Sequence, residues 1–170
     1  MKNTVIIGLG LIGGSLAIDL RRLYPQMNIL GVDNNKQHLK EAIELGLVDA
    51  AATTDQIHNA DLVVMAIPVH ATAKLLAEIL GKVGDKTLVV DMGSTKSAIC
   101  EAVYEHENRR NYLAMHPIAG TEHSGPSAAI SNLCVGKTNI ICEVEKTAFK
   151  LQEKALKLFT DVGMRMRYMN

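Results

Sequence analysis

The sequence has no surplus of charge of either sign. Among its 170 residues, 18 are lysine or arginine and 18 are aspartate or glutamate. A protein that binds nucleic acid or an anionic membrane surface mainly through its charge needs a basic face, and this balance does not indicate one. We therefore expect neither nucleic acid nor a membrane as a partner.

Long apolar runs and disulfide spacings are also missing. No apolar run reaches the roughly 18 residues that a membrane-spanning helix needs, and the first residues lead into a strand rather than a secretory signal. Cys100, Cys134 and Cys142 are widely separated and odd in number, which is typical of reduced thiols in a cytosolic protein. We expect a cytoplasmic protein of one domain, which at this length buries roughly 70% of the surface of the unfolded chain.

The sequence contains no internal repeat and no low-complexity linker, and short apolar segments alternate with amphipathic ones. This alternation predicts an α/β fold, with a doubly wound, mostly parallel sheet covered by helices on both faces. The expected strands are 3–7, 28–32, 62–66, 87–90, 112–115, 139–142 and 165–169, and the expected helices are 11–23, 36–45, 71–80, 97–106 and 146–162. The whole chain, 1–170, is then one Rossmann-like domain.

The last expected helix has the clearest period. Ala148, Leu151, Ala155 and Phe159 fall on one face, whereas Lys150, Glu153, Lys154 and Lys157 are expected to face water.

The most informative segment is a GxGxxG turn that directly follows the first apolar run. Gly8 allows a sharp turn, Gly10 leaves room for the backbone to approach a pyrophosphate, and Gly13 lets the next helix pack close to the sheet. The phosphates would lie at the helix N-terminus, over Leu11 and Ile12, where free N–H groups and the helix dipole favour negative charge. The alternative is a glycine turn with a structural role only.

An acidic residue follows this turn at the spacing expected for dinucleotide binding. Asp33 ends the second expected strand, twenty residues after Gly13. Its carboxylate can accept hydrogen bonds from the ribose hydroxyls and would repel a 2′-phosphate, so NAD is favoured over NADP. The alternative is that Asp33 caps the helix that begins near Asn35.

Three further segments follow expected strands and so lie at the edge of the sheet where a doubly wound fold binds its cofactor. The first contains Ile67 and Pro68. Pro68 would fix the chain where it turns over the dinucleotide, or it simply ends the strand without touching a ligand. His70, which follows, could reach the cofactor, but as a surface residue at the start of a helix it has no special claim to a role.

The second segment is Asp91-Met92-Gly93-Ser94-Thr95-Lys96. The Ser94 hydroxyl can bridge a substrate oxygen and a basic partner, but Ser94 or Thr95 is equally an ordinary N-cap for the next helix. Lys96 could meet an anionic group in the crevice or point to solvent. We expect Asp91 to hold local backbone rather than to take part in chemistry.

The third segment begins at His116. A histidine here titrates near neutral pH and can take a proton from a hydroxyl as hydride leaves the adjacent carbon. The alternative is a histidine hydrogen-bonded within a loop. His116 and His123 lack a third ligand at metal spacing, so no metal site is expected. Thr121 and Glu122 could position substrate or gate the cleft, or act as local caps.

Together these segments resemble the prephenate dehydrogenase family, of which arogenate dehydrogenases are close relatives. The resemblance covers essentially all 170 residues and rests on Gly-Leu-Gly-Leu-Ile-Gly-Gly-Ser-Leu from residue 8, Ala66-Ile67-Pro68-Val69, Asp91-Met92-Gly93-Ser94-Thr95-Lys96 and His116-Pro117-Ile118-Ala119-Gly120-Thr121-Glu122. The last two segments are the most specific.

The resemblance implies a role for each matching residue. His116 is then the catalytic histidine, hydrogen-bonded to the 4-hydroxyl of prephenate. Ser94 orients that histidine and the substrate near the nicotinamide, and Glu122 helps to organise the entrance of the site. The implied reaction is NAD-dependent oxidative decarboxylation of prephenate to 4-hydroxyphenylpyruvate, in tyrosine biosynthesis.

Members of the family continue into a helical domain that forms the homodimer and contacts the substrate carboxylates. We expect this chain to be the NAD-binding half of such an enzyme, without that domain. The alternatives are an arogenate dehydrogenase, another NAD-dependent dehydrogenase of a small acid, or an NAD-binding module without catalytic activity.

Overall fold

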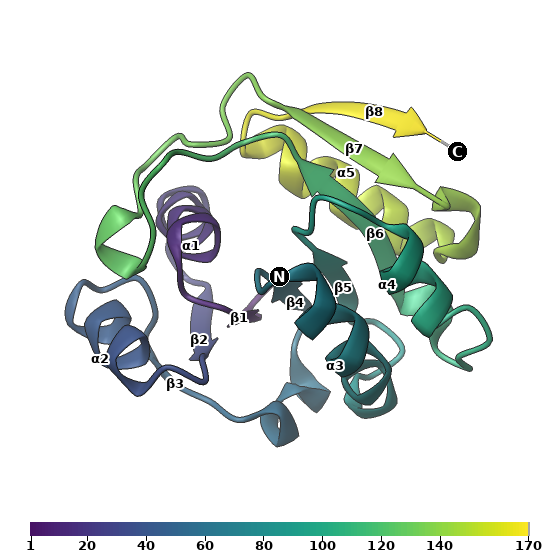
Figure 1. Cartoon of the computed structure of the whole chain (residues 1–170), viewed down its shortest axis with the longest axis horizontal. Helices are drawn as coiled ribbons and strands as arrows, with labels where there is room; N and C mark the ends of the chain where they lie inside the picture. Colours follow the sequence, from purple (N-terminus) through teal and green to yellow (C-terminus); the bar gives the residue numbers. More distant parts are fainter. Residues whose placement is uncertain (170) are drawn as a thin grey trace.

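In the computed structural model, which describes residues 1–169, the chain forms an eight-stranded sheet with helices on both faces (Figure 1). The strands are β1 (Asn3–Ile7), β2 (Asn28–Val32), β3 (Ala50–Ala51), β4 (Leu62–Met65), β5 (Leu88–Asp91), β6 (Tyr112–Pro117), β7 (Thr138–Cys142) and β8 (Arg165–Met169). Their order in the sheet is β3-β2-β1-β4-β5-β6-β7-β8, so the chain reverses direction across the sheet between β1 and β4. Such a switch point is where doubly wound folds bind their ligands.

The sheet is parallel from β3 to β6, whereas β7 is antiparallel to β6 and β8 runs parallel to β7. This arrangement confirms the predicted fold class.

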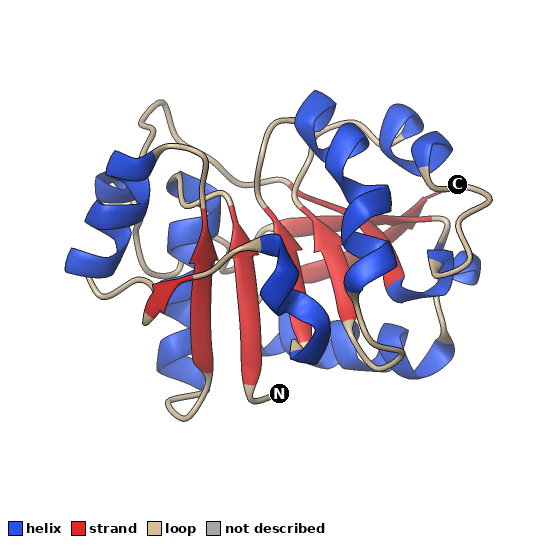
Figure 2. Ribbon diagram, turned by 90° about the horizontal axis from the view of Figure 1, so that it is seen from below, coloured by secondary structure: helices blue, strands red, loops and turns tan. Residues whose placement is uncertain are grey.

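The helices are α1 (Leu11–Leu23), α2 (Lys36–Glu44), α3 (Val69–Lys82), α4 (Ser97–Ala102) and α5 (Phe149–Asp161). Figure 2 shows helices in front of the sheet and behind it. Side chains from α1, α2 and α5 pack on one face, and those from α3 and α4 pack on the other. The neighbours Val63 and Val64 belong to different cores, because successive side chains of a strand point to opposite faces. None of the helices formed by residues 1–169 has the length and apolar character needed to cross a membrane.

Most element bounds agree with the prediction, and the differences have local causes. β6 extends to Pro117 because His116 and Pro117 still pair with β7. α4 ends at Ala102 rather than at residue 106, since the buried Val103 leaves the helical conformation with φ −126°. The short β3 was not predicted, because two exposed alanines carry no apolar pattern.

The last helix required two corrections. α5 starts only at Phe149, after a separate 3₁₀ turn. Ala148 is its N-cap, but it still packs against the same core as the buried face of the helix. Lys154 does not simply face water. Its Nζ donates to the backbone oxygens of Asp61 (2.6 Å) and Lys86 (3.0 Å), and burial lowers the pKa of the ammonium group.

The connection between β6 and β7, residues 118–137, is here called the strap, because it crosses over α1 before it returns to the sheet (Figure 1). The buried Asp19 of α1 accepts hydrogen bonds from the Asn132 N–H (3.0 Å) and the Ser131 hydroxyl (3.1 Å). Ser15 accepts one from the Ile130 N–H (3.0 Å). These contacts hold the strap against the helix that follows the glycine turn.

Candidate functional site

The glycine turn after β1 has room for a ligand at one glycine and none at the other two. Gly8 has φ +94°, and a Cβ atom there would lie 2.3 Å from the Ala66 oxygen. A Cβ atom at Gly13 would lie 2.0 Å from the Gly8 oxygen, whereas one at Gly10 would meet no atom within 4 Å. The turn is therefore closed against the sheet at Gly8 and Gly13 and open at Gly10, where the sequence predicts the pyrophosphate.

The N-terminus of α1 begins at this open position. Its N-cap, Gly10, supplies no side-chain hydrogen bond, and the first turn contains no acidic residue. The first N–H groups of a helix have no partners within it, so those of Leu11 and Ile12 can bind an anion. The structure thus places both residues where the phosphate hypothesis needs them.

Asp33 is joined to the glycine turn. Its Oδ2 accepts a hydrogen bond from the Leu9 N–H (2.9 Å), and its Oδ1 accepts one from the Asn35 N–H (2.8 Å). The alternative role as a helix cap is wrong, because Asn35 caps α2 with its own side chain. Each carboxylate oxygen retains a lone pair, so Asp33 can still accept a bond from a ribose hydroxyl.

A cleft of about 480 Å³ lies at the carboxyl ends of β1, β2 and β4. It brings Asp33 together with Ile67 and Pro68, as the sequence predicts. Its α3 side is formed by His70, Ala71, Lys74 and Leu75, of which only His70 was expected from the sequence to be able to reach the cofactor. The spacing of these residues was the available signal, because positions three and four apart share a helix face.

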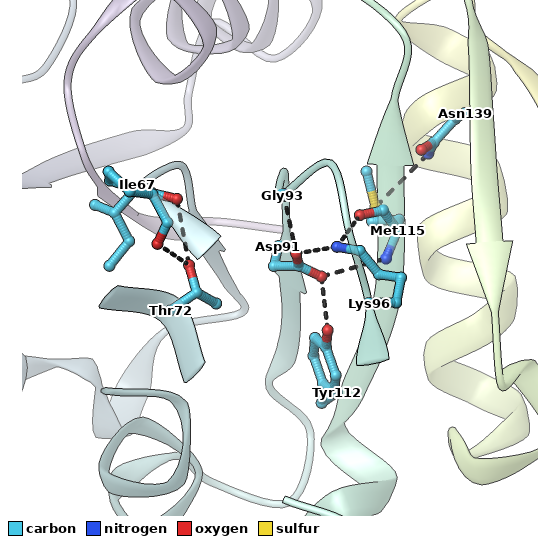
Figure 3. A network of polar contacts seen from close by, with 9 residues as sticks. Ile67, Thr72, Asp91, Gly93, Lys96, Tyr112, Met115 and Asn139 are labelled. Atoms are coloured by element: carbon cyan, nitrogen blue, oxygen red, sulfur yellow. Dashed lines mark hydrogen bonds and ion pairs between the residues drawn. The ribbon is translucent and has the colours of Figure 1, made fainter. Parts of the chain in front are cut away.

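The Ile67–Pro68 turn is held from α3. The Thr72 hydroxyl donates to the carbonyl oxygens of both Ile67 and Pro68, at 3.3 Å each (Figure 3). Pro68 is the N-cap of α3, which is why the helix begins at Val69, earlier than predicted. This wall of the cleft is therefore fixed by the helix start.

Beyond the cleft, a buried carboxylate lies at the end of β5 (Figure 3). Asp91 is fully buried and accepts hydrogen bonds from the Tyr112 hydroxyl (2.6 Å), the Gly93 N–H (3.0 Å) and the Lys96 ammonium group. Asp91 holds local structure, as predicted. Lys96 does not point to solvent, since its ammonium group is bound to the Asp91 carboxylate and to the Met115 oxygen (2.8 Å).

Ser94 and Thr95 are both exposed, and neither caps the next helix. The N-cap of α4 is Lys96, which forms no side-chain capping bond. The capping alternative for Ser94 is therefore wrong, and its hydroxyl is free of that role.

His116 is half-buried near the carboxyl end of β6. Burial lowers the pKa of its imidazole, the nearby Lys96 ammonium lowers it further, and Asp91 acts in the opposite direction. The imidazole is then neutral at pH 7 and able to accept a proton. Since β1, β4, β5 and β6 are parallel, His116 lies at the same edge of the sheet as the glycine turn.

Glu122 and Thr121 lie on the exposed part of the strap. Glu122 is 83% exposed and pairs with His123 over 3.4 Å, while the Thr121 hydroxyl accepts a bond from the His123 N–H (3.2 Å). Thr121 is thus the local cap. The polar contacts of residues 1–169 join neither Ser94 nor Glu122 to His116.

The comparison with protein families decides the family to which this fold belongs. Residues 16–168 match the family described as prephenate dehydrogenase, nucleotide-binding domain. This chain belongs to that family. The match begins just after the glycine turn, so the turn is an independent sign of nucleotide binding.

Individual proteins agree with the family. The chain is 35% identical over 137 residues to a prephenate dehydrogenase of Lactococcus lactis, covering 78% of this chain and 38% of that protein. It superposes with a TM-score of 0.86 and 29% identity on the A. aeolicus prephenate dehydrogenase solved with hydroxyphenyl propionate and NAD+, covering 100% of this chain and 60% of that one. For the arogenate dehydrogenase of Synechocystis the TM-score is 0.89 and the identity 26%, with 99% and 59% covered. The chain thus spans between about two fifths and three fifths of these relatives.

Proposed function

We propose that this chain binds NAD across the glycine turn and the cleft beside it. Three features support this: open space at Gly10, an uncapped helix N-terminus there, and an acid, Asp33, placed for a ribose. The cleft beside Asp33, with Ile67 and Pro68 on its wall, has the size of a small-molecule site. The presence of NAD+ in the similar A. aeolicus enzyme adds support.

We further propose that the protein is the NAD-binding half of a prephenate dehydrogenase. When bound, NAD supplies the hydride acceptor. The hydride leaves the hydroxyl-bearing ring carbon, the ring carboxylate leaves as carbon dioxide, and the products are 4-hydroxyphenylpyruvate and NADH. The position and the neutral state of His116 carry this proposal.

His116 acts as the general base in this scheme. Its neutral imidazole takes the proton of the 4-hydroxyl while the adjacent C–H bond breaks, and it returns that proton when loss of carbon dioxide restores the aromatic ring. The half-buried site limits competition from water for the imidazole. We assign to Ser94 the orientation of His116 and substrate, and to Glu122 the entrance of the site.

Arogenate is the second candidate substrate, supported by the similarity to the Synechocystis arogenate dehydrogenase. The two substrates share the ring hydroxyl that His116 would serve, so the residues described here do not favour one of them. Parallel assays with both compounds separate these alternatives.

Several properties of the whole enzyme would depend on regions of the relatives that this chain does not match. We propose that a helical domain there supplies cations for the substrate carboxylates and forms a homodimer. We also propose a cytoplasmic location, which agrees with the three free cysteines of the described residues.

The test is turnover of prephenate with NAD, followed by NADH absorbance, for His116→Asn in a form of the protein that is active. Loss of a general base lowers kcat by roughly 10²- to 10⁴-fold. His58→Asn, at an exposed position in the 3₁₀ turn Thr54–Asn59, is the matched control and keeps near-normal turnover. Near-normal turnover of His116→Asn would refute the assignment.

A further inference from the structure

The hydrogen-bonded ladder between β5 and β6 stops before it reaches His116. The two strands pair at Val89 with Tyr112 and at Val90 with Leu113. Two residues further along β6, Met115 still pairs with Ile141 of β7, but on the side of β5 its backbone groups meet side chains instead of another strand. Its N–H donates to Asp91 Oδ1 (3.3 Å), and its carbonyl oxygen accepts from Lys96 Nζ (2.8 Å).

These side chains are themselves firmly held (Figure 3). Asp91 is fully buried and the Lys96 side chain is only 11% exposed. Besides Lys96 and Met115, the carboxylate binds the Tyr112 hydroxyl and the Gly93 N–H. A buried carboxylate with this many donors has little freedom to move, because each lost bond would leave a charge unsatisfied.

We propose that Asp91 is a positioning residue for His116, acting through Lys96 and Tyr112. On the side of β5 these side chains replace the missing ladder bonds. Together with the pairing to β7 on the other side, they fix the backbone of Met115 and thereby set the direction of the next side chain in β6. This inference rests on the proposed role of His116 as the general base.

The same pair sets the electrostatic surroundings of the imidazole. Lys96 and Asp91 are the charged groups that act on His116, with opposite effects. Tyr112 on β6 and Cys142 on β7 adjoin the pair and stay neutral at pH 7, because burial raises the pKa of both. Arg167 on β8 is exposed and lies two strands away from His116. The residue between them in the sheet is Ile140 of β7, which pairs with both.

The test is NMR titration of the His116 imidazole in the 170-residue chain. Lys96→Met removes the cation and is expected to raise the pKa of His116. Asp91→Asn leaves the cation unopposed and is expected to lower the same pKa. Lys96→Arg keeps the charge and is the matched control, with a titration close to that of the parent. General loss of structure would move both variants the same way, toward the value of an exposed histidine, so opposite shifts show that both charges act on a folded site.

Two further measurements address geometry. Exchange of the Met115 amide hydrogen is expected to accelerate in Lys96→Met and in Tyr112→Phe. Both variants leave the Asp91 carboxylate in place, so they carry the test if Asp91→Asn does not fold. In a form that turns over prephenate, Lys96→Met is expected to lower kcat by about 10²-fold, since small displacements of a reacting group cost that much. NAD affinity is expected to stay unchanged.

An unchanged exchange rate at Met115 in both Lys96→Met and Tyr112→Phe, or pKa shifts in the same direction, would overturn the proposal. Its failure is distinct from that of the proposed function, because the titration needs no catalysis. If His116→Asn stays active while the opposite shifts are observed, the positioning network stands and the assignment of His116 as the base is wrong.

Discussion

The carboxylate of Asp33 accepts a hydrogen bond from the backbone N–H of Leu9 over 2.9 Å. The acid that follows β2 and the glycine turn that follows β1 are therefore one structural unit. A change at Asp33 is expected to alter the phosphate site as well as the ribose site.

Asp33→Asn is expected to weaken NAD binding and to reduce the preference for NAD over NADP by about tenfold, or ~1.4 kcal/mol. The amide removes the charge that repels a 2′-phosphate, and it cannot accept both backbone hydrogen bonds in the same way. Calorimetric titration with the two cofactors measures both effects. Asp49→Asn is the control, because Asp49 also accepts a backbone N–H bond, from Ile29 (2.7 Å), but does not line the cleft. An unchanged NAD/NADP ratio in Asp33→Asn would contradict the ribose assignment.

Gly10→Ala and Gly13→Ala are expected to separate binding from folding. The added methyl group meets no atom within 4 Å at Gly10, so the free energy of unfolding changes by about 1 kcal/mol or less. That methyl group occupies the space predicted for the pyrophosphate, and NAD affinity falls tenfold or more, at least ~1.4 kcal/mol. At Gly13 it would lie 2.0 Å from the Gly8 oxygen, and stability falls by about 3 kcal/mol.

Urea denaturation and cofactor titration of the two variants test this pair. Tight NAD binding by Gly10→Ala would show that the phosphate lies elsewhere. Equal loss of stability in both variants would contradict the open space at Gly10.

The depressed pKa of His116 has consequences for both activity and stability. Protonation of the imidazole removes the base, so kcat/KM is expected to fall on the acid side, with its midpoint below the ordinary histidine value of about 6.5, and to be level near pH 7. Between about pH 6.5 and the folded-state pKa, the unfolded chain binds the proton and the folded chain does not. Stability is therefore full above that window and declines as the pH falls through it.

A kcat/KM profile and denaturation at a series of pH values check these expectations. His116→Asn is expected to lose this contribution to the pH dependence of stability. An acid limb centred above pH 6.5 would contradict the environment described for the imidazole.

The strap depends on one buried carboxylate. Asp19→Ala removes the acceptor for the Asn132 N–H and the Ser131 hydroxyl, and it is expected to lower the free energy of unfolding by about 1–3 kcal/mol. Hydrogen exchange is expected to accelerate in residues 118–137 before it does so in the sheet. Glu44→Ala is the control, since its pair with Lys40 is exposed and contributes about 0.5 kcal/mol or less. Unchanged exchange in the strap would show that other contacts hold it.

The pattern along the chain determined much of the architecture. Alternation of apolar strands with amphipathic helices gave the correct fold class, and β1, β2, β8 and α1 begin and end where the sequence predicts. This succeeded because burial on both faces of a parallel sheet leaves a continuous apolar run for each strand. The glycine spacing was predictable because the close approach of backbone atoms at Gly8 and Gly13 allows only glycine.

Only the tertiary structure decided which polar groups meet. The sequence left the partners of Lys96 open and placed Lys154 in water, whereas both ammonium groups bind backbone oxygens of residues distant in the chain. It also offered Ser94, Thr95 and Asp33 as helix caps, roles that fall to Lys96 and Asn35. Periodicity reports which side of an element is buried, because burial of apolar surface is not directional. The choice of a hydrogen-bond partner is directional and depends on atoms that only the folded chain brings within reach.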